Sequence, residues 1–77
     1  MIYQNVSRMI AEILGLNEED ITHKAVLRSD YGMKPIEIAK LVIECEKQFN
    51  ITIHDEDVHT FHCTDDVVLY IEKLYTH

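Results

Sequence analysis

The chain has 77 residues, of which fourteen are acidic and seven basic, so its formal charge is −7. A chain of this length forms one domain with one modest core, so we expect residues 1–77 to be a single domain without a deep catalytic cleft. This favours a binding or carrier module over an enzyme, and the negative charge disfavours nucleic acids and anionic membranes as partners.

The sequence indicates a monomer in the cytoplasm. Polar residues interrupt the first ten positions, unlike a signal peptide, and no apolar stretch is long enough to span a membrane. The only cysteines, Cys45 and Cys63, lack the spacing of a disulfide framework, so we expect reduced thiols.

The first segment is predicted to be an amphipathic helix that ends at Gly15 in the left-handed conformation, with Leu16 folding back onto it. Its apolar residues recur at helical spacing: Ile2, Val6, Met9, Ile10, Ile13 and Leu14. From Leu16 to Lys34 no period is sustained. We expect a long loop with room for one short helical turn, pinned to the core at Ile21, Ala25, Val26 and Leu27.

Pro35 is the only proline and suits the first turn of a second helix. One apolar stripe of this helix is predicted to face the core: Ile38, Leu41, Val42, Cys45 and Phe49. A second stripe comprises Ile36, Ala39 and Ile43, although a surface helix normally needs only one. The second stripe is either a docking face or a contact with the long loop.

Two further helices are predicted. A short one has Asp55 as its N-cap and Glu56 and Asp57 in its first turn, with Val58 and Phe61 pointing inward. The last begins at Thr64 and presents a core face of Val67, Val68, Ile71 and Leu74, with Tyr70 and Tyr75 beside it. The fold class is therefore all-α, with a core of Ile10, Ile13, Leu27, Leu41, Val42, Phe49, Phe61, Val68 and Ile71.

The stretch that runs from Leu27 through Asp30 and Gly32 into the second helix resembles the signature of acyl carrier proteins. In that family a hydrophobic residue, two variable positions and Asp-Leu-Gly lead into Asp-Ser-Leu, and Leu27, Asp30 and Gly32 keep this frame. The match runs without a gap from Ala25 to Ile71. The resemblance implies a small four-helix bundle, three helices longer and one short, with a long loop after the first.

The centre of that motif departs from the family. Its Asp-Ser-Leu corresponds to Lys34, Pro35 and Ile36, and the serine is the residue that carries 4′-phosphopantetheine. Covalent attachment needs a nucleophilic oxygen, which proline lacks, so we predict no phosphopantetheine at Pro35. The only serines are Ser7, inside the first helix, and Ser29, which lacks the flanking aspartate and leucine.

The resemblance also implies that partner enzymes of acyl, polyketide or peptide synthesis meet the second helix. In the family this helix offers carboxylates, whereas here lysines stand among Glu37, Glu44 and Glu46. Such charges set association rate and partner choice, so the usual basic partners should bind less readily. The predicted partner-binding residues are Lys34, Ile36, Glu37, Ala39, Lys40, Ile43 and Lys47.

Metal binding and catalysis are weaker interpretations. His54, His59, His62 and Cys63 are ligand types, but no second group stands at finger-like spacing, so we expect a solvated surface and no metal. Cys45 falls on the core stripe and should be an inert thiol. Asp30 and Asp55 are expected to stabilise turns and helix ends rather than act as catalytic residues.

Three functions remain open from the sequence. The favoured one is a carrier-fold module that docks onto an enzyme without carrying a thioester. An alternative is a genuine acyl or peptidyl carrier whose attachment serine is mutated or relocated. A third is a small metal- or redox-responsive protein that uses His59, His62 and Cys63.

Overall fold

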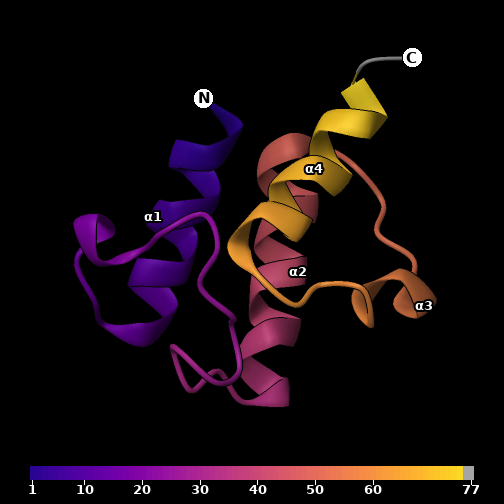
Figure 1. Ribbon diagram of the computed structural model, residues 1–77. Coiled ribbons are helices and arrows are strands. Elements are labelled where there is room, and N and C mark those ends of the chain that lie inside the picture. Colours follow the sequence, from indigo (N-terminus) through magenta and orange to yellow (C-terminus); the bar gives the residue numbers. More distant parts are fainter. Residues whose placement is uncertain (76–77) are drawn as a thin grey trace.

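The computed structural model describes residues 1–75. Helix α1 spans Ile2–Leu14, a 3₁₀ turn η1 spans Glu18–Asp20, and helices α2, α3 and α4 span Pro35–Phe49, Asp55–Val58 and Thr64–Tyr75 (Figure 1). Within these residues there is no strand, only one isolated antiparallel bridge between Val26 and Cys63. The predicted all-helical bundle, with three longer helices and a short one, is confirmed, and so is the short turn in the long loop.

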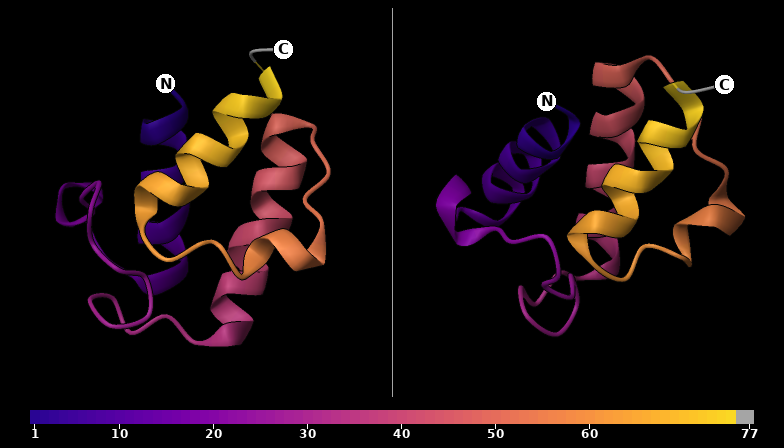
Figure 2. Two further views of the ribbon diagram at one scale, coloured as in Figure 1. Left: turned by 45° about the vertical axis from the view of Figure 1, so that its right-hand side comes forward. Right: turned by 45° about the horizontal axis from the view of Figure 1, so that its top comes forward.

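Helix α1 is the centre of the packing because it contacts both α2 and α4. The short α3 stands to the side, on the connection between α2 and α4 (Figure 2). No helix in the described part of the chain is long and apolar enough to cross a membrane.

Helices α1 and α2 each end at a residue whose backbone is in the left-handed conformation. Gly15 has φ 71°, and the N–H groups of Gly15 and Leu16 both point to the carbonyl of Ala11, although the Leu16 side chain is 41% exposed. Asn50 has φ 54° and closes α2 in the same way. Asparagine tolerates this conformation better than other residues with a side chain, so both ends follow from local chemistry.

Some residues that were predicted for the core lie only at its edge. Of the residues expected there, Ile13, Val42 and Phe49 are only partly buried at its edge, and Leu74 is 37% exposed in the last turn of α4. A helical pattern identifies which face points inward but not where along the helix the bundle ends. The fully enclosed apolar residues are Val6, Met9, Ile10, Leu27, Leu41, Cys45, Val67 and Ile71, joined by Ala11, Ile21, Met33, Ile53, Phe61 and Val68.

The long loop is held by backbone hydrogen bonds to the segment before α4 and to the first turn of α4. The Leu27 N–H donates to the His62 carbonyl at 2.8 Å, and the Asp65 N–H donates to the His23 carbonyl at 3.0 Å. Ile21 and Leu27 are buried as predicted, whereas Val26 is 38% exposed. Val26 takes part through its backbone instead, because it pairs with Cys63.

The start of α3 differs by one residue from the prediction. His54 is the N-cap and Asp55 is the first helical residue, and no side chain caps this end. Asp55, Glu56 and Asp57 do occupy the first turn, where negative charge suits the exposed N–H groups. The predicted start of α4 at Thr64, with Asp65 and Asp66 in its first turn, is confirmed.

Candidate functional site

The start of α2 is built from a short hydrogen-bonded turn. Lys34 is the N-cap and Pro35 the first helical residue, where its missing N–H leaves nothing unpaired. The Glu37 carboxylate accepts a hydrogen bond from the Lys34 N–H at 2.8 Å. In the preceding turn the Asp30 carboxylate accepts one from the Val26 N–H at 2.6 Å, so Asp30 is a turn residue as predicted.

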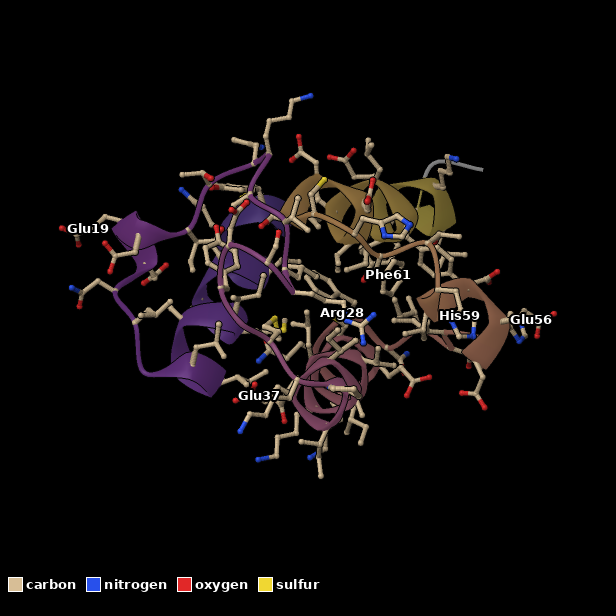
Figure 3. The ribbon with its side chains drawn as sticks, turned by 60° about the horizontal axis from the view of Figure 1, so that its bottom comes forward. Glu19, Arg28, Glu37, Glu56, His59 and Phe61 are labelled. Carbon is tan, nitrogen blue, oxygen red and sulfur yellow. The ribbon has the colours of Figure 1, made fainter. Side chains whose placement is uncertain are left out.

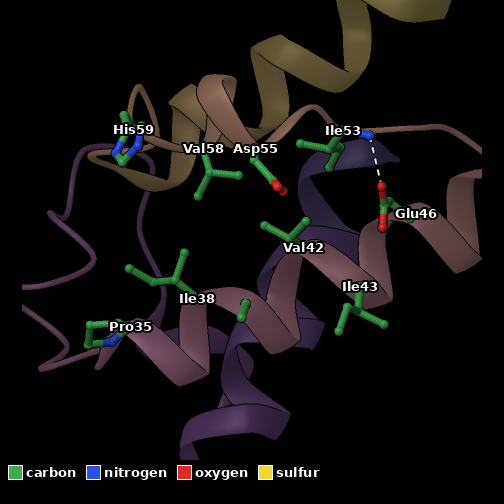
Figure 4. Close-up of a pocket in the computed structure, with 10 residues that line it drawn as sticks. Pro35, Ile38, Val42, Ile43, Glu46, Ile53, Asp55, Val58 and His59 are labelled. Atoms are coloured by element: carbon green, nitrogen blue, oxygen red, sulfur yellow. Dashed lines mark hydrogen bonds between the residues drawn. The ribbon is translucent and has the colours of Figure 1, made fainter.

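An apolar groove of about 380 Å³ lies between α2 and α3 and begins at Pro35 (Figure 4). Ile38 and Val42 of α2 face Val58 of α3 and Ile53 of the connection across it, while Glu46 and Asp55 are its acidic members.

A second hollow of about 230 Å³ shares Pro35, Ile38, Val58 and His59 with the groove and extends it toward Arg28, Phe61 and His62 (Figure 3). The groove therefore has mainly apolar walls, and Arg28 and His62 lie at the end near Pro35. The groove could not be predicted from the sequence, because its two walls come from segments whose contact no local pattern reveals.

Two hydrogen bonds fix the walls of this groove. The Glu46 carboxylate on α2 accepts a bond from the Ile53 N–H at 2.9 Å. On the other wall the Tyr70 hydroxyl of α4 donates to the Asp57 carboxylate of α3 at 2.7 Å. Burial, and then the bond to Asp57, raise the pKa of Tyr70, so its hydroxyl keeps the proton that it donates.

The second apolar stripe of α2 faces solvent. Ile36 is 67% exposed and Ile43 53% exposed, and Ala39 between them is exposed as well. Contact with the long loop, one of the two interpretations of this stripe, therefore does not account for Ile36 or Ile43. Lys34, Lys40 and Lys47 are also exposed, and none of them makes an ion pair within 4.0 Å among residues 1–75.

The two thiols lie in different environments. Cys45 is fully buried, with its sulfur 3.8 Å from that of Met9. Burial, and then the charges of Glu44 and Glu46, raise the pKa of the Cys45 thiol to about 12, so it is an inert core residue. Cys63 is partly exposed, and its backbone forms the isolated bridge with Val26.

The histidines near α3 do not converge on one point. His54 precedes α3, His59 follows it and His62 lies further along the chain, all three exposed. Within residues 1–75 no group of three His, Cys, Asp or Glu side chains is placed to hold a metal ion. The structure thus brings together no ligand set from His59, His62 and Cys63.

Neither serine of the chain lies at the start of α2, where Pro35 stands. Ser7 is buried in α1, and its hydroxyl has no hydrogen-bond partner among the described residues. Ser29 is exposed in the loop, six residues before Pro35 and on the other side of Gly32, whose φ is 65°.

Residues 4–71 match the family model described as the phosphopantetheine attachment site, which defines the class of the protein. The acyl carrier protein of Phytoplasma australiense is 36% identical over 73 residues, covering 95% of this chain and 96% of that protein. That of Thermotoga maritima is 33% identical over 72 residues, covering 94% and 89%. The chain belongs to the acyl carrier protein family.

Solved structures agree on the fold. A putative acyl carrier protein from Anaplasma phagocytophilum superimposes with a TM-score of 0.87 at 24% identity, covering 97% of this chain and 89% of that one. The acyl carrier protein from Enterococcus faecalis gives 0.79 at 24% identity, covering 94% and 91%. Members of this family are carriers, so the prediction that the chain is not an enzyme is confirmed.

Pro35, the first residue of α2, does not fit phosphopantetheine, the group named in the description of the family. Phosphopantetheine is bonded through a side-chain oxygen, and the ring of Pro35 contains no side-chain heteroatom. Pro35 therefore cannot hold that group covalently.

Proposed function

We propose that this chain is an acyl-carrier-type docking module that binds an enzyme of acyl, polyketide or peptide metabolism in the cytoplasm without carrying phosphopantetheine. The proposal keeps the family's role of presenting a small helical surface to enzymes and removes the covalent cargo. One observation carries it: Pro35 opens α2, where the resemblance expects the attachment serine.

The chemistry of attachment supports this proposal. In loading, a serine oxygen attacks the β-phosphorus of coenzyme A, the phosphoanhydride bond breaks, and the adenosine bisphosphate portion leaves. A base must take the proton of the attacking hydroxyl. Pro35 supplies neither oxygen nor proton, so the reaction has no first step at this residue.

Neither serine is well placed to replace it. Ser7 would have to leave the buried face of α1 to react. Ser29 is exposed, but it lies in the turn closed by Asp30 and Val26 rather than at the start of α2. A transferase that positions the helix start would hold Ser29 away from its reacting centre, and displacements of about 1 Å already slow such reactions strongly.

The test is to incubate the protein with coenzyme A and a promiscuous phosphopantetheinyl transferase and to measure its intact mass. We expect no mass gain for the natural sequence. A gain of one phosphopantetheine, mapped by peptide fragmentation to Ser29 or to any other residue, would overturn the proposal in favour of a relocated carrier site.

Two variants accompany this test. Pro35→Ser restores a hydroxyl oxygen at the start of α2, and Ser29→Ala is the control that removes the exposed serine of the loop. Serine is compatible with the first turn of a helix, so Pro35→Ser should fold. A mass gain in Pro35→Ser but not in the natural protein would show that the surrounding motif is still recognised and that the missing oxygen alone prevents loading. Ser29→Ala should behave like the natural protein.

A further inference from the structure

Side chains from three separate segments meet at His23 in the long loop. The imidazole ring stacks on the ring of Tyr3 from α1, with the ring centroids 3.8 Å apart and the planes 11° from parallel. Its Nδ1 atom lies 2.6 Å from a carboxylate oxygen of Asp65 in the first turn of α4. We call these three side chains the His23 cluster. The cluster connects the loop to α1 and α4, two helices that also pack against each other.

The backbone of the same stretch of loop is bonded to the start of α4. Besides the hydrogen bonds from the Leu27 and Asp65 N–H groups described above, the Thr64 N–H donates to the Ala25 carbonyl at 3.3 Å. We call residues 21–27, which these bonds hold, the loop strap. Its side chains and its backbone therefore both depend on the first turn of α4 and on the residues just before it.

The two ends of the loop strap lie in the core, whereas its middle meets solvent. Ile21 is 4% exposed and Leu27 0% exposed, but the side chain of His23 is 59% exposed. The imidazole can therefore exchange protons with water while the strap stays in place. The strap is anchored at both ends, and a group that gains or loses charge with pH holds its middle.

Both side-chain contacts of His23 become stronger when the imidazole is protonated. A protonated ring has N–H donors on both nitrogens and a positive charge, so it bonds to the Asp65 carboxylate as an ion pair. A neutral ring can donate from Nδ1 in only one of its two tautomers. The face of an aromatic ring attracts a cation within about 6 Å of its centroid, so the stacked Tyr3 ring also favours the charged form.

Asp65 is the nearest charge to the imidazole. His23 and Asp65 form the one ion pair within 4.0 Å among residues 1–75. Charges that are further away act more weakly, and salt screens them where they are exposed. Lys24 and the Met1 amino group, which oppose protonation, are both exposed. The other titratable groups on the surrounding segments are Asp20 and Tyr31 of the loop and His62 and Asp66 at the start of α4.

We propose that protonation of His23 tightens the loop strap onto α1 and α4 and that deprotonation loosens it, which makes the His23 cluster a pH-sensitive switch. Histidines change charge between about pH 5 and 8, where aspartates are ionised. Arg28 directly follows the strap and lines the hollow beside Pro35, so loosening the strap also frees part of the wall of that hollow. This inference does not depend on the docking function proposed above.

Amide hydrogen exchange of the whole chain, followed by NMR, tests the switch. The N–H groups of Leu27 and Asp65 report opening of the strap, and that of Leu41 inside α2 reports opening of the whole bundle. Protection factors remove the intrinsic effect of pH on exchange. We expect those of Leu27 and Asp65, relative to Leu41, to be about two- to fivefold higher near pH 6 than near pH 8, as for one partly exposed ion pair. No change, or a parallel change in all three, would overturn the inference.

A pair of histidine variants assigns the effect to one ring. His23→Gln keeps a side chain that can bond to Asp65 but does not titrate, so its relative protection should be the same at both pH values. The matched control is His62→Gln, which removes an exposed histidine at the other end of the Leu27 hydrogen bond and should keep the pH dependence. A dependence that persists in His23→Gln, or that disappears in His62→Gln, would overturn the assignment.

Two further variants test the partners of the ring, with circular dichroism to confirm their helical fold. Asp65→Asn keeps an acceptor but removes the charge, so it should reduce the pH dependence to less than about twofold. Tyr3→Phe keeps the stacked ring and removes only the hydroxyl, which donates to the Ile21 carbonyl at 3.0 Å, so it should retain the dependence. The full dependence in Asp65→Asn, or its loss in Tyr3→Phe, would contradict a switch built on the imidazole charge.

Discussion

Glu46 lies on a surface helix but has a structural role. Its carboxylate accepts the Ile53 N–H at 2.9 Å and ties the end of α2 to the segment that forms the far wall of the groove. We predict that Glu46→Ala lowers the free energy of unfolding by about 1–2 kcal/mol, because a partly buried N–H loses a charged acceptor. Urea denaturation measures this change.

Glu44 is the matched control for Glu46, since it lies on the same helix and makes no hydrogen bond to another described residue beyond those of the helix backbone. Glu44→Ala should stay within about 0.5 kcal/mol of the natural protein. Equal losses in the two variants would mean that the Ile53 bond contributes nothing of its own.

The two cysteines should differ sharply in reactivity. Cys45 is fully buried with its pKa raised to about 12, while Cys63 is partly exposed. Only the thiolate reacts with disulfide reagents. At about pH 8 we expect one thiol to be labelled rapidly in the folded protein and both in denaturant, as counted by released chromophore. Rapid labelling of both in the folded protein would contradict the buried environment of Cys45.

At the scale of elements, Asp66 in the first turn of α4 binds the segment that directly precedes this helix. Its carboxylate accepts the N–H groups of His62 and Cys63 at 2.9 and 3.0 Å, next to the bridge between Val26 and Cys63. Burial alone would raise the pKa of Asp66, but the backbone bonds from Cys63 and His62 outweigh it and hold the pKa below 3.8. The ionised carboxylate therefore stabilises the folded state.

This arrangement predicts a pH dependence with a definite sign. A carboxyl whose folded pKa is depressed contributes stability above its unfolded pKa, and that contribution is lost as the pH falls through the folded pKa. We expect Asp66→Asn to cost about 1 kcal/mol near neutrality, and we expect the difference to shrink in acid as the pH falls through the lowered pKa of Asp66. Urea midpoints across this range measure it, with Glu72→Gln as the exposed control on the same helix.

The elements also show what sequence patterns can and cannot specify. Gly15, Pro35 and the acids after Thr64 signal helix ends through local backbone chemistry, and these ends fall where they were predicted. The start of α3 was displaced by one residue, and the groove beside it was not foreseen. Both depend on contacts between distant segments, such as Tyr70 with Asp57, for which spacing along the chain gives no signal.

Part of the candidate site could likewise be predicted from the sequence, and part could not. The proline and the second stripe were identified from the sequence, and the exposure of Ile36 and Ile43 agrees with a surface available to a partner. The sequence could not show which acidic side chains have hydrogen-bond partners. Glu37 and Glu46 each accept a backbone N–H, whereas Lys34, Lys40 and Lys47 make no ion pair within 4.0 Å among residues 1–75.

At the scale of the whole molecule, a bundle of 77 residues has one core and little stability to spare. Leu41 is 1% exposed on the inner side of α2, whereas Ile43, two residues on, is 53% exposed on its outer side. The pair therefore separates what the helix contributes to the core from what it exposes to solvent.

We predict that Leu41→Ala lowers the free energy of unfolding by about 2–5 kcal/mol, through lost burial and the cavity left in the core. A small domain has total stability near the lower end of about 5–15 kcal/mol, so this loss would leave a measurable unfolded fraction at room temperature. Ile43→Ala should change stability by less than about 0.5 kcal/mol. Urea denaturation with helical circular dichroism checks both, and a large loss in Ile43→Ala would mean that the exposed face of α2 is held by the fold rather than left for a partner to cover.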